Sequence, residues 1–185
     1  MLPIIAALLR PVLAAVTVFI GTLGMALGQP SFYQVFGLTG LLIPVIAVTA
    51  GSIGFHYRLG PLVSWAYIAA GAGFYLAFSQ GGTLFWLVPY FLAIVSLPAI
   101  LRFKGKALIG LLSFYTAMSE QVTLNILSLL LLSAVAVGPF WSVVTPFMYV
   151  ERTVATVAGT AGIVALKSGL GGRLNLDVKL TREVS

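Results

Sequence analysis

Long apolar stretches, separated by short polar breaks with glycine or proline, run through most of the chain. A helix needs about 20 mostly apolar residues to cross a bilayer. Proline follows Arg10 and Gly60, where its missing N–H suits the first turn of a helix. The pattern predicts an all-α bundle of about six membrane-spanning helices, over residues 11–28, 35–55, 61–79, 83–101, 107–134 and 140–166.

The last two predicted helices are the least regular. Their apolar sequence is interrupted at Ser119-Glu120-Gln121 and at Glu151-Arg152, and a turn is predicted at Gly138-Pro139. If helices ended at the polar clusters, residues 107–121 and 140–152 would be re-entrant or interfacial, because such pieces are too short to cross at about 1.5 Å per residue. We therefore expect two long helices, each with an acid near mid-membrane.

The two ends of the chain differ from this pattern. Residues 1–9 are apolar, and we expect them to lie along the membrane interface or to lead into the first span. Residues 168–185 are polar and should form a solvated cytoplasmic tail, although the alternating apolar residues within them also allow a short strand against a partner. The rest, residues 1–167, is expected to be a single transmembrane domain.

Small residues recur on four of these helices at separations of three or four, the spacing that lets helices approach closely in lipid. We expect these faces to pack inside the bundle. Their members are Gly24 and Gly28; Gly37, Gly40, Pro44, Ala47, Gly51 and Gly54; Ala66, Ala70, Gly73 and Ala77; and Ala155, Gly159 and Gly162. Aromatic residues near one end of the bundle are expected to form an interfacial belt. They are Phe78, Phe85, Trp86, Tyr90, Phe91, Phe140, Trp141 and Phe147.

Composition places the chain in the membrane class. Of its 185 residues 60% are hydrophobic and only 8% charged, with a mean hydropathy of +1.10, whereas soluble domains carry about 25% charged residues. The absence of cysteine excludes disulfides and a thiol nucleophile, and the single histidine, His56, excludes a histidine-based metal cluster. The sequence assigns no metal site and no cofactor.

The distribution of charge predicts the orientation. Lysine and arginine concentrate in short cytoplasmic loops, and nine of the ten cations fall on one side of the six-span model. We therefore expect a multi-pass protein of the plasma membrane with both termini in the cytoplasm. The tenth cation, Arg152, is placed inside the membrane.

Polar residues within the last two spans form the candidate site. An ionisable side chain at bilayer depth costs roughly 2.5–3.5 kcal/mol on insertion scales, so it is usually paired or functional. If the two helices are antiparallel neighbours, Arg152 can meet Glu120 or Glu151 in a polar seam. The alternatives are a pair that fixes helix register and a path for a solute or proton. The seam comprises Thr116, Glu120, Gln121, Asn125, Tyr149, Glu151 and Arg152.

Three classes of function fit this pattern. The first is a small-solute or ion transporter, or its membrane-embedded binding subunit, and the second is a non-catalytic subunit of a larger complex, respiratory and quinone-linked or other. The partners expected are the bilayer and other membrane subunits or a second copy, with no nucleic acid.

The third class is a lipid- or isoprenoid-handling enzyme. Arg10-Pro11, residues 55–58 and residues 102–106 are spaced somewhat as in intramembrane prenyltransferases. That family holds magnesium diphosphate with aspartate-rich motifs, and this chain has no aspartate before Asp177, so the resemblance carries over no catalytic residue. We rank transport first and assign no catalytic residue.

Overall fold

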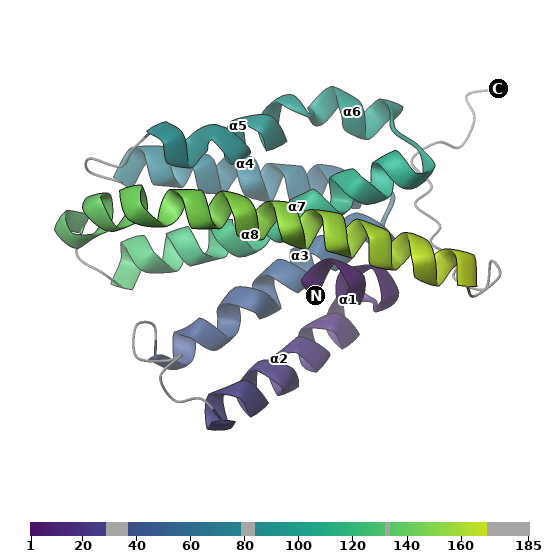
Figure 1. Ribbon diagram of the computed structural model, residues 1–185, viewed down its shortest axis with the longest axis horizontal. Helices are drawn as coiled ribbons and strands as arrows, with labels where there is room; N and C mark the ends of the chain where they lie inside the picture. The colour runs from purple at the N-terminus through teal and green to yellow at the C-terminus, as the bar shows by residue number, and fades with distance from the viewer. Residues whose placement is uncertain (29–36, 79–83, 132–133, 170–185) are drawn as a thin grey trace.

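The computed structural model describes residues 1–28, 37–78, 84–131 and 134–169, with the side chains of residue 84 and of residues 134–144 excepted. These residues are helical almost throughout and contain no strand. The helices are α1 (Leu2–Leu8), α2 (Pro11–Gly28), α3 (Leu42–His56), α4 (Gly60–Phe78), α5 (Val88–Val95), α6 (Leu97–Arg102), α7 (Gly105–Leu131) and α8 (Ala134–Gly169), with 3₁₀ helices at Gly37–Leu41 and Leu84–Leu87 (Figure 1).

Four helical stretches are long and apolar enough to cross a membrane, namely Pro11–Gly28, Gly37–His56, Gly60–Phe78 and Phe85–Arg102. They lie close to the first four predicted spans, and they make the chain an all-α protein with the character of a multi-pass membrane protein. Within the described ranges, α7 and α8 are not among the helices apolar enough to cross a membrane, so six spans are not confirmed. The polar clusters around Glu120 and Arg152 lower the mean hydropathy of these two helices.

Helix α7 is the centre of the bundle. It packs against α3, α4 and α8 and also contacts α1 and α5 (Figure 1). Fourteen of its 27 residues are buried, among them Ser113, Ser119, Gln121 and Asn125. A helix surrounded by other helices does not need an apolar surface on every side, which explains its mixed composition.

The first nine residues pack against the bundle and precede α2, and their place at the membrane interface remains a prediction. Residues Leu2–Leu8 form α1, and its Pro3, Ala6 and Ala7 are buried against α3, α7 and α8. Chain direction then changes at Leu9, whose backbone is extended and whose carbonyl accepts a hydrogen bond from Ser52 Oγ at 2.5 Å. A proline in the first turn suits the start of this short helix, and small residues on one face let α1 approach α3, α7 and α8 closely.

The fourth predicted span is not one continuous helix. It breaks at Ser96 (φ −78°, ψ 2°) into α5 and α6. Pro98 has no N–H to donate to the carbonyl of Ile94, four residues earlier, and its ring crowds that carbonyl, which favours a break here. The indole N–H of Trp65 donates to that carbonyl instead, at 3.0 Å, and stabilises the break.

The predicted turn at Gly138-Pro139 is also wrong, because both residues lie inside α8, which begins at Ala134. Pro139 is the sixth residue of α8 and lacks the N–H that would donate to the carbonyl of Val135, a loss that membrane helices tolerate. The connection between α7 and α8 falls at residues 132–133, and the predicted tail from residue 170 onward likewise lies outside the described residues.

The small-residue faces behave differently from one helix to the next. A Cβ built on Gly51 of α3 would overlap the side chain of Thr116 on α7, and one built on Gly159 of α8 would overlap Pro3 of α1. By contrast Gly24 on α2 and Gly73 on α4 have no neighbour within 4 Å of that position. On α4 the expected stripe is wrong: its members are exposed or open, and the buried face is made by Ser64, Ile68, Gly71, Ala72 and Tyr75.

The aromatic belt is only partly exposed. Phe78, Phe85 and Phe91 face outward, whereas Trp86 and Tyr90 are fully buried in the core. Phe147 is exposed, and the side chains of Phe140 and Trp141 lie outside the described ones. Burial of Trp86 and Tyr90 brings polar ring atoms into the centre of the bundle, where they need partners.

Candidate functional site

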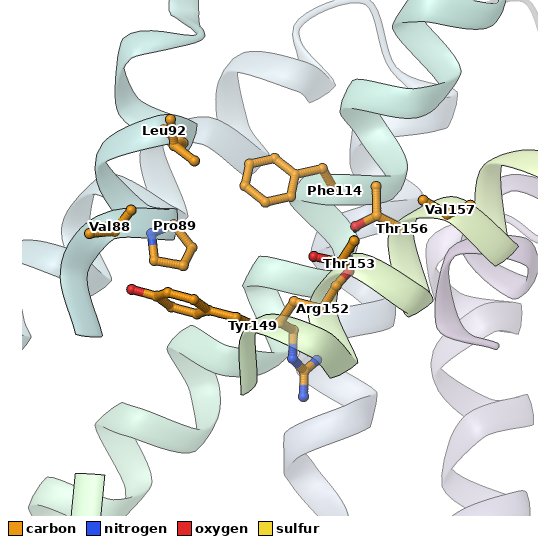
Figure 2. A pocket seen from close by; sticks show the side chains of 9 residues that line it. All are labelled: Val88, Pro89, Leu92, Phe114, Tyr149, Arg152, Thr153, Thr156 and Val157. Carbon is orange, nitrogen blue, oxygen red and sulfur yellow. Dashed lines mark hydrogen bonds between the residues drawn. The ribbon is translucent and has the colours of Figure 1, made fainter. Parts of the chain in front are cut away.

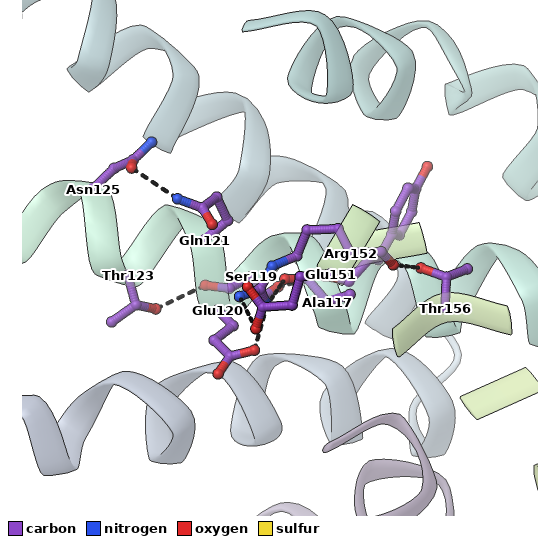
Figure 3. Close-up of polar contacts among 10 residues, drawn as sticks. Ala117, Ser119, Glu120, Gln121, Thr123, Asn125, Glu151, Arg152 and Thr156 are labelled. Atoms are coloured by element: carbon purple, nitrogen blue, oxygen red, sulfur yellow. Dashed lines mark hydrogen bonds and ion pairs between the residues drawn. The ribbon is translucent and has the colours of Figure 1, made fainter. Parts of the chain in front are cut away.

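A buried arginine joins the two long helices. Arg152 of α8 forms ion pairs with Glu120 of α7 and, at 3.2 Å from Oε1, with Glu151 (Figure 3). Its Nη1 also donates to the carbonyl of Ala117 at 3.0 Å. The Arg152 side chain is 7% exposed, against 28% for Glu120 and 66% for Glu151. Only the arginine is removed from solvent or lipid, and the two carboxylates reach outward from it.

The register of the two helices places these groups at the same height. Glu120 and Arg152 each lie about 15 residues, or roughly 22 Å, from the end where α7 begins and α8 finishes. Antiparallel packing therefore brings them together, in the arrangement predicted for the polar seam. Arg152 Nε has no hydrogen-bond partner among the described residues, so one donor of the guanidinium is not satisfied by the surrounding protein.

The amides of the predicted seam do not join this cluster. Gln121 Nε2 donates to Asn125 Oδ1 at 3.1 Å, and Asn125 Nδ2 donates to the hydroxyl of Tyr90 on α5 at 2.5 Å. All three side chains are about 1% exposed. They form a closed hydrogen-bonded chain between α7 and α5, distinct from the ion pairs beside α8.

Two further side-chain contacts join α7 to its neighbours, separately from this chain, and involve tyrosines outside the predicted seam. The hydroxyl of Tyr67 on α4 lies 2.8 Å from Thr123 Oγ1, and that of Tyr115 lies 2.6 Å from Ser96 Oγ at the helix break. A tyrosine inside an apolar span needs a partner for its hydroxyl. That requirement is the signal that points to Tyr67, Tyr90 and Tyr115 without a structure.

The remaining two predicted seam residues have other roles. The Thr116 hydroxyl donates to the carbonyl of Leu112 in its own helix, at 2.8 Å, and the side chain packs on Gly51. Tyr149 donates its hydroxyl to the carbonyl of Phe85 and so ties α8 to the segment before α5. Thr116 is therefore a packing residue, whereas Tyr149 lies beside the arginine cluster.

A cleft of about 260 Å³ lies between α5, α7 and α8, next to Arg152. Five apolar side chains make most of its wall, and three hydroxyl-bearing residues and the stem of Arg152 complete it. Its lining is Val88, Pro89, Leu92, Phe114, Tyr149, Arg152, Thr153, Thr156 and Val157 (Figure 2). Val88, Leu92 and Val157 are exposed, so this cleft, which we call the α5–α8 cleft, reaches the outer surface of the bundle.

The chemistry of the α5–α8 cleft follows from the direction of its polar groups. The guanidinium of Arg152 points away from the apolar side chains and toward Glu120 on α7 (Figures 2 and 3). Thr156 donates its hydroxyl to the carbonyl of Arg152 at 2.7 Å. A bound molecule would thus contact apolar side chains and a few hydroxyl oxygens. The ion pairs lie outside the cleft and fix α8, which forms one of its walls, against α7. In the described part of the chain, no three His, Asp or Glu residues lie where they could hold a metal ion together.

Comparison of this chain with protein-family models, with curated proteins and with solved structures finds no match. We therefore infer function from the geometry of the α7–α8 ion pairs and the α5–α8 cleft.

Proposed function

We propose that the protein is a membrane-embedded transport or binding component for a small, largely apolar solute that occupies the α5–α8 cleft. The observation that supports this most is a cavity of about 260 Å³, open at the bundle surface and placed directly against a buried arginine. Membrane proteins rarely keep a buried charge without a use for it. Ligand sites are typically apolar concavities with a few polar groups that fix orientation.

The ion pairs connect one wall of the α5–α8 cleft to α7 and set the charge beside it. Glu120 and Arg152 join α7 to α8, and the same stretch of α8 forms one wall of the α5–α8 cleft. With both carboxylates ionised the three groups carry a net charge of −1, so the cluster disfavours an anionic solute. Neutral or singly cationic solutes of mostly apolar character fit the lining and the charge together.

The test is a binding screen on the purified protein in mild detergent. Small neutral apolar compounds, small amines and simple salts are added separately, and the melting temperature is recorded. A ligand that binds only the folded protein at 100 times its Kd stabilises it by about 2.7 kcal/mol. We expect at least one apolar compound to raise the melting temperature.

Two tryptophan variants localise the effect. Thr153→Trp fills the α5–α8 cleft and should abolish the shift, whereas Val154→Trp, at an exposed neighbouring position outside that lining, should retain it. If no apolar compound stabilises the protein, or if both variants keep the shift, the cleft is not the binding site.

A second candidate, a non-catalytic subunit of a larger membrane complex, is favoured by α2. This helix lies at the edge of the bundle beside α3 (Figure 1). Only 17% of its 18 residues are buried, against 50% of an 18-residue stretch within Gly37–His56. Its Gly24 and Gly28 have open space in front of them. A stoichiometric partner chain that co-purifies with the wild type, and is lost on Gly24→Leu, would favour this role over the solute-binding one.

The orientation, with the cation-rich end in the cytoplasm of a plasma membrane, remains part of the proposal. It is supported by Arg102, Lys104, Lys106 and Lys167, which lie at the end of the bundle where α6 finishes and α7 begins. The chain has no cysteine, so single cysteines at Gln80 and Lys104 can be labelled with a membrane-impermeant reagent. Labelling from opposite sides is expected, and labelling from the same side would refute the proposed topology.

A further inference from the structure

A second cleft, of about 270 Å³, lies between the first turns of α7 and the last turns of α8, far from Arg152. It is lined by Gly105, Lys106, Ile109, Val164, Lys167 and Ser168, and we call it the basic cleft. Its two lysines come from different helices, and α7 and α8 are packed together along this length, with Thr160 close to Gly110. The two lysines thus come from opposite walls of one hollow.

The charge of the basic cleft is not balanced by the described protein. Both lysines are exposed, and the ion pairs of the described residues involve Arg152 alone among the cations. Glu120 and Glu151, the acids among those residues, are roughly 20 Å away along the helices. Arg102 and Lys104 stand just before Gly105 and add to the positive potential, and the first turn of α7 contains no acid. This hollow therefore favours an anion.

The floor of the basic cleft is apolar. Ile109 is buried and Val164 is half-buried, one on each helix, beneath the lysines. The apolar stretch Phe85–Arg102, long enough to cross a membrane, ends just before the cleft begins. The hollow thus has a cationic rim above an apolar floor, at the height where a membrane-crossing segment ends. A free inorganic anion would use only the rim.

We propose that the basic cleft binds the phosphate headgroup of an anionic phospholipid, with Lys106 and Lys167 holding the phosphate and Ile109 and Val164 contacting the lipid's glycerol and upper acyl region. Basic pockets between helices at a membrane surface recognise anionic headgroups in this way. This site is separate from the α5–α8 cleft, and neither proposal depends on the other.

The test measures the melting temperature of the full chain, purified in mild detergent, during titration with short-chain phosphatidylglycerol. Short-chain phosphatidylcholine, zwitterionic and of the same chain length, is the reference lipid. We expect phosphatidylglycerol to raise the melting temperature more than phosphatidylcholine does. Equal shifts would overturn the proposal, because the lysines would then add nothing to lipid binding.

Two double variants with the same change of charge sharpen the result. Lys106→Gln with Lys167→Gln removes the rim of the basic cleft, while Arg102→Gln with Lys104→Gln removes two exposed cations beside it. Each lysine near an anionic surface contributes about a fivefold factor in binding, so the first variant should need roughly 25-fold more lipid for half the shift. The second should weaken binding by a clearly smaller factor, because Arg102 and Lys104 add to the potential but do not line the basic cleft. An equal loss in both would mean diffuse attraction and no site.

Inorganic phosphate and glycerol 3-phosphate distinguish the source of the anion. At the concentration of phosphatidylglycerol that half-saturates the shift, both should leave the melting temperature unchanged, because neither carries the acyl chains that cover the apolar floor. If either matches the lipid, the basic cleft is a site for soluble phosphate compounds and the lipid assignment is wrong. The lysines are exposed, so both variants are expected to melt like the wild type without lipid.

Discussion

The two sides of α7 differ in how deeply their polar residues are buried and how closely neighbouring helices pack on them. Toward α3, α4 and α5 its amides are buried and hydrogen-bonded to each other and to Tyr90, and several buried hydroxyls donate to carbonyls of α7 itself. The Gly51 and Gly71 backbones approach α7 so closely that an added Cβ would overlap Thr116 or Val122. Toward α8, Glu120 is partly exposed, Gly110 has ordinary space in front of it, and the α5–α8 cleft lies nearby. One side is closed and the other is open.

This difference teaches that polarity within an apolar helix does not by itself mark a functional site. On the closed side, Gln121, Asn125 and Tyr90 are hydrogen-bonded to one another and hold α5 against α7, as buried polar networks do. On the open side, Arg152 keeps an unsatisfied Nε next to a cavity. The candidate functional site differs from the structural network in two respects: it contains a charged group with a free donor, and a cavity lies beside it.

The largest expected effect comes from opening the closed side. Asn125→Leu leaves the Gln121 amide and the Tyr90 hydroxyl buried without this partner, and each such group costs about 1–3 kcal/mol. We expect a loss of about 2–5 kcal/mol in the free energy of unfolding, measured by denaturant titration in detergent micelles. Ser128→Ala is the matched control, because Ser128 Oγ donates to the carbonyl of Leu124 in its own helix. Similar losses in both variants would mean that the network contributes no more than a local bond.

An intermediate effect separates the two sides by packing alone. Gly51→Ala forces Thr116 to move and should cost about 1–3 kcal/mol, the usual range for overpacking. Gly110→Ala places its methyl 3.8 Å from Thr160 Cγ2, an ordinary contact, and should leave the melting temperature unchanged or slightly higher. Melting curves of the two alanine variants test this directly, and equal behaviour would show that α8 packs on α7 as tightly as α3 does.

The smallest expected effect is on the open side. Glu120→Gln leaves Arg152 with Glu151 and the Ala117 carbonyl, so the loss should be about 1 kcal/mol, below the 3–5 kcal/mol of a fully buried pair. Arg152→Gln should cost more, because it leaves two carboxylates side by side. The double variant Glu120→Gln with Arg152→Gln should then recover part of that loss, as a double-mutant cycle of melting temperatures would reveal. Strict additivity would mean that the pair contributes no coupling.

Much of the fold follows from the apolar pattern. The predicted ranges of the first three spans lie close to α2, α3 and α4, because runs of apolar residues bounded by Gly-Pro and polar breaks leave few other choices. Pro98 is a local signal for the break at Ser96 that the prediction of one continuous span did not use. The stabilising Trp65 lies on another helix, 29 residues before the Ile94 carbonyl that it binds. The continuation of α8 through Pro139 was missed because local sequence favours a turn there and only the tertiary structure decides otherwise.

For the site, sequence predicted the Arg152 cluster but not its surroundings. Three ionisable residues in apolar sequence are unusual enough to be found from their cost alone. The separation of Gln121 and Asn125 from this cluster depends on which neighbours α7 has on each side, and helical periodicity does not contain that information. The α5–α8 cleft likewise depends on α5 and α8 remaining apart, which is a property of three helices together.

The packing of α1 against α8 sets an order for assembly during synthesis. Pro3 and Ile4 fit against Gly159 and Gly162, roughly 150 residues later in the chain, a contact of the kind that forms slowly. As the ribosome delivers helices to the membrane one after another, α1 waits for its last partner until the second half of α8 has been made. A chain that stops before Gly159 therefore leaves that face of α1 uncovered.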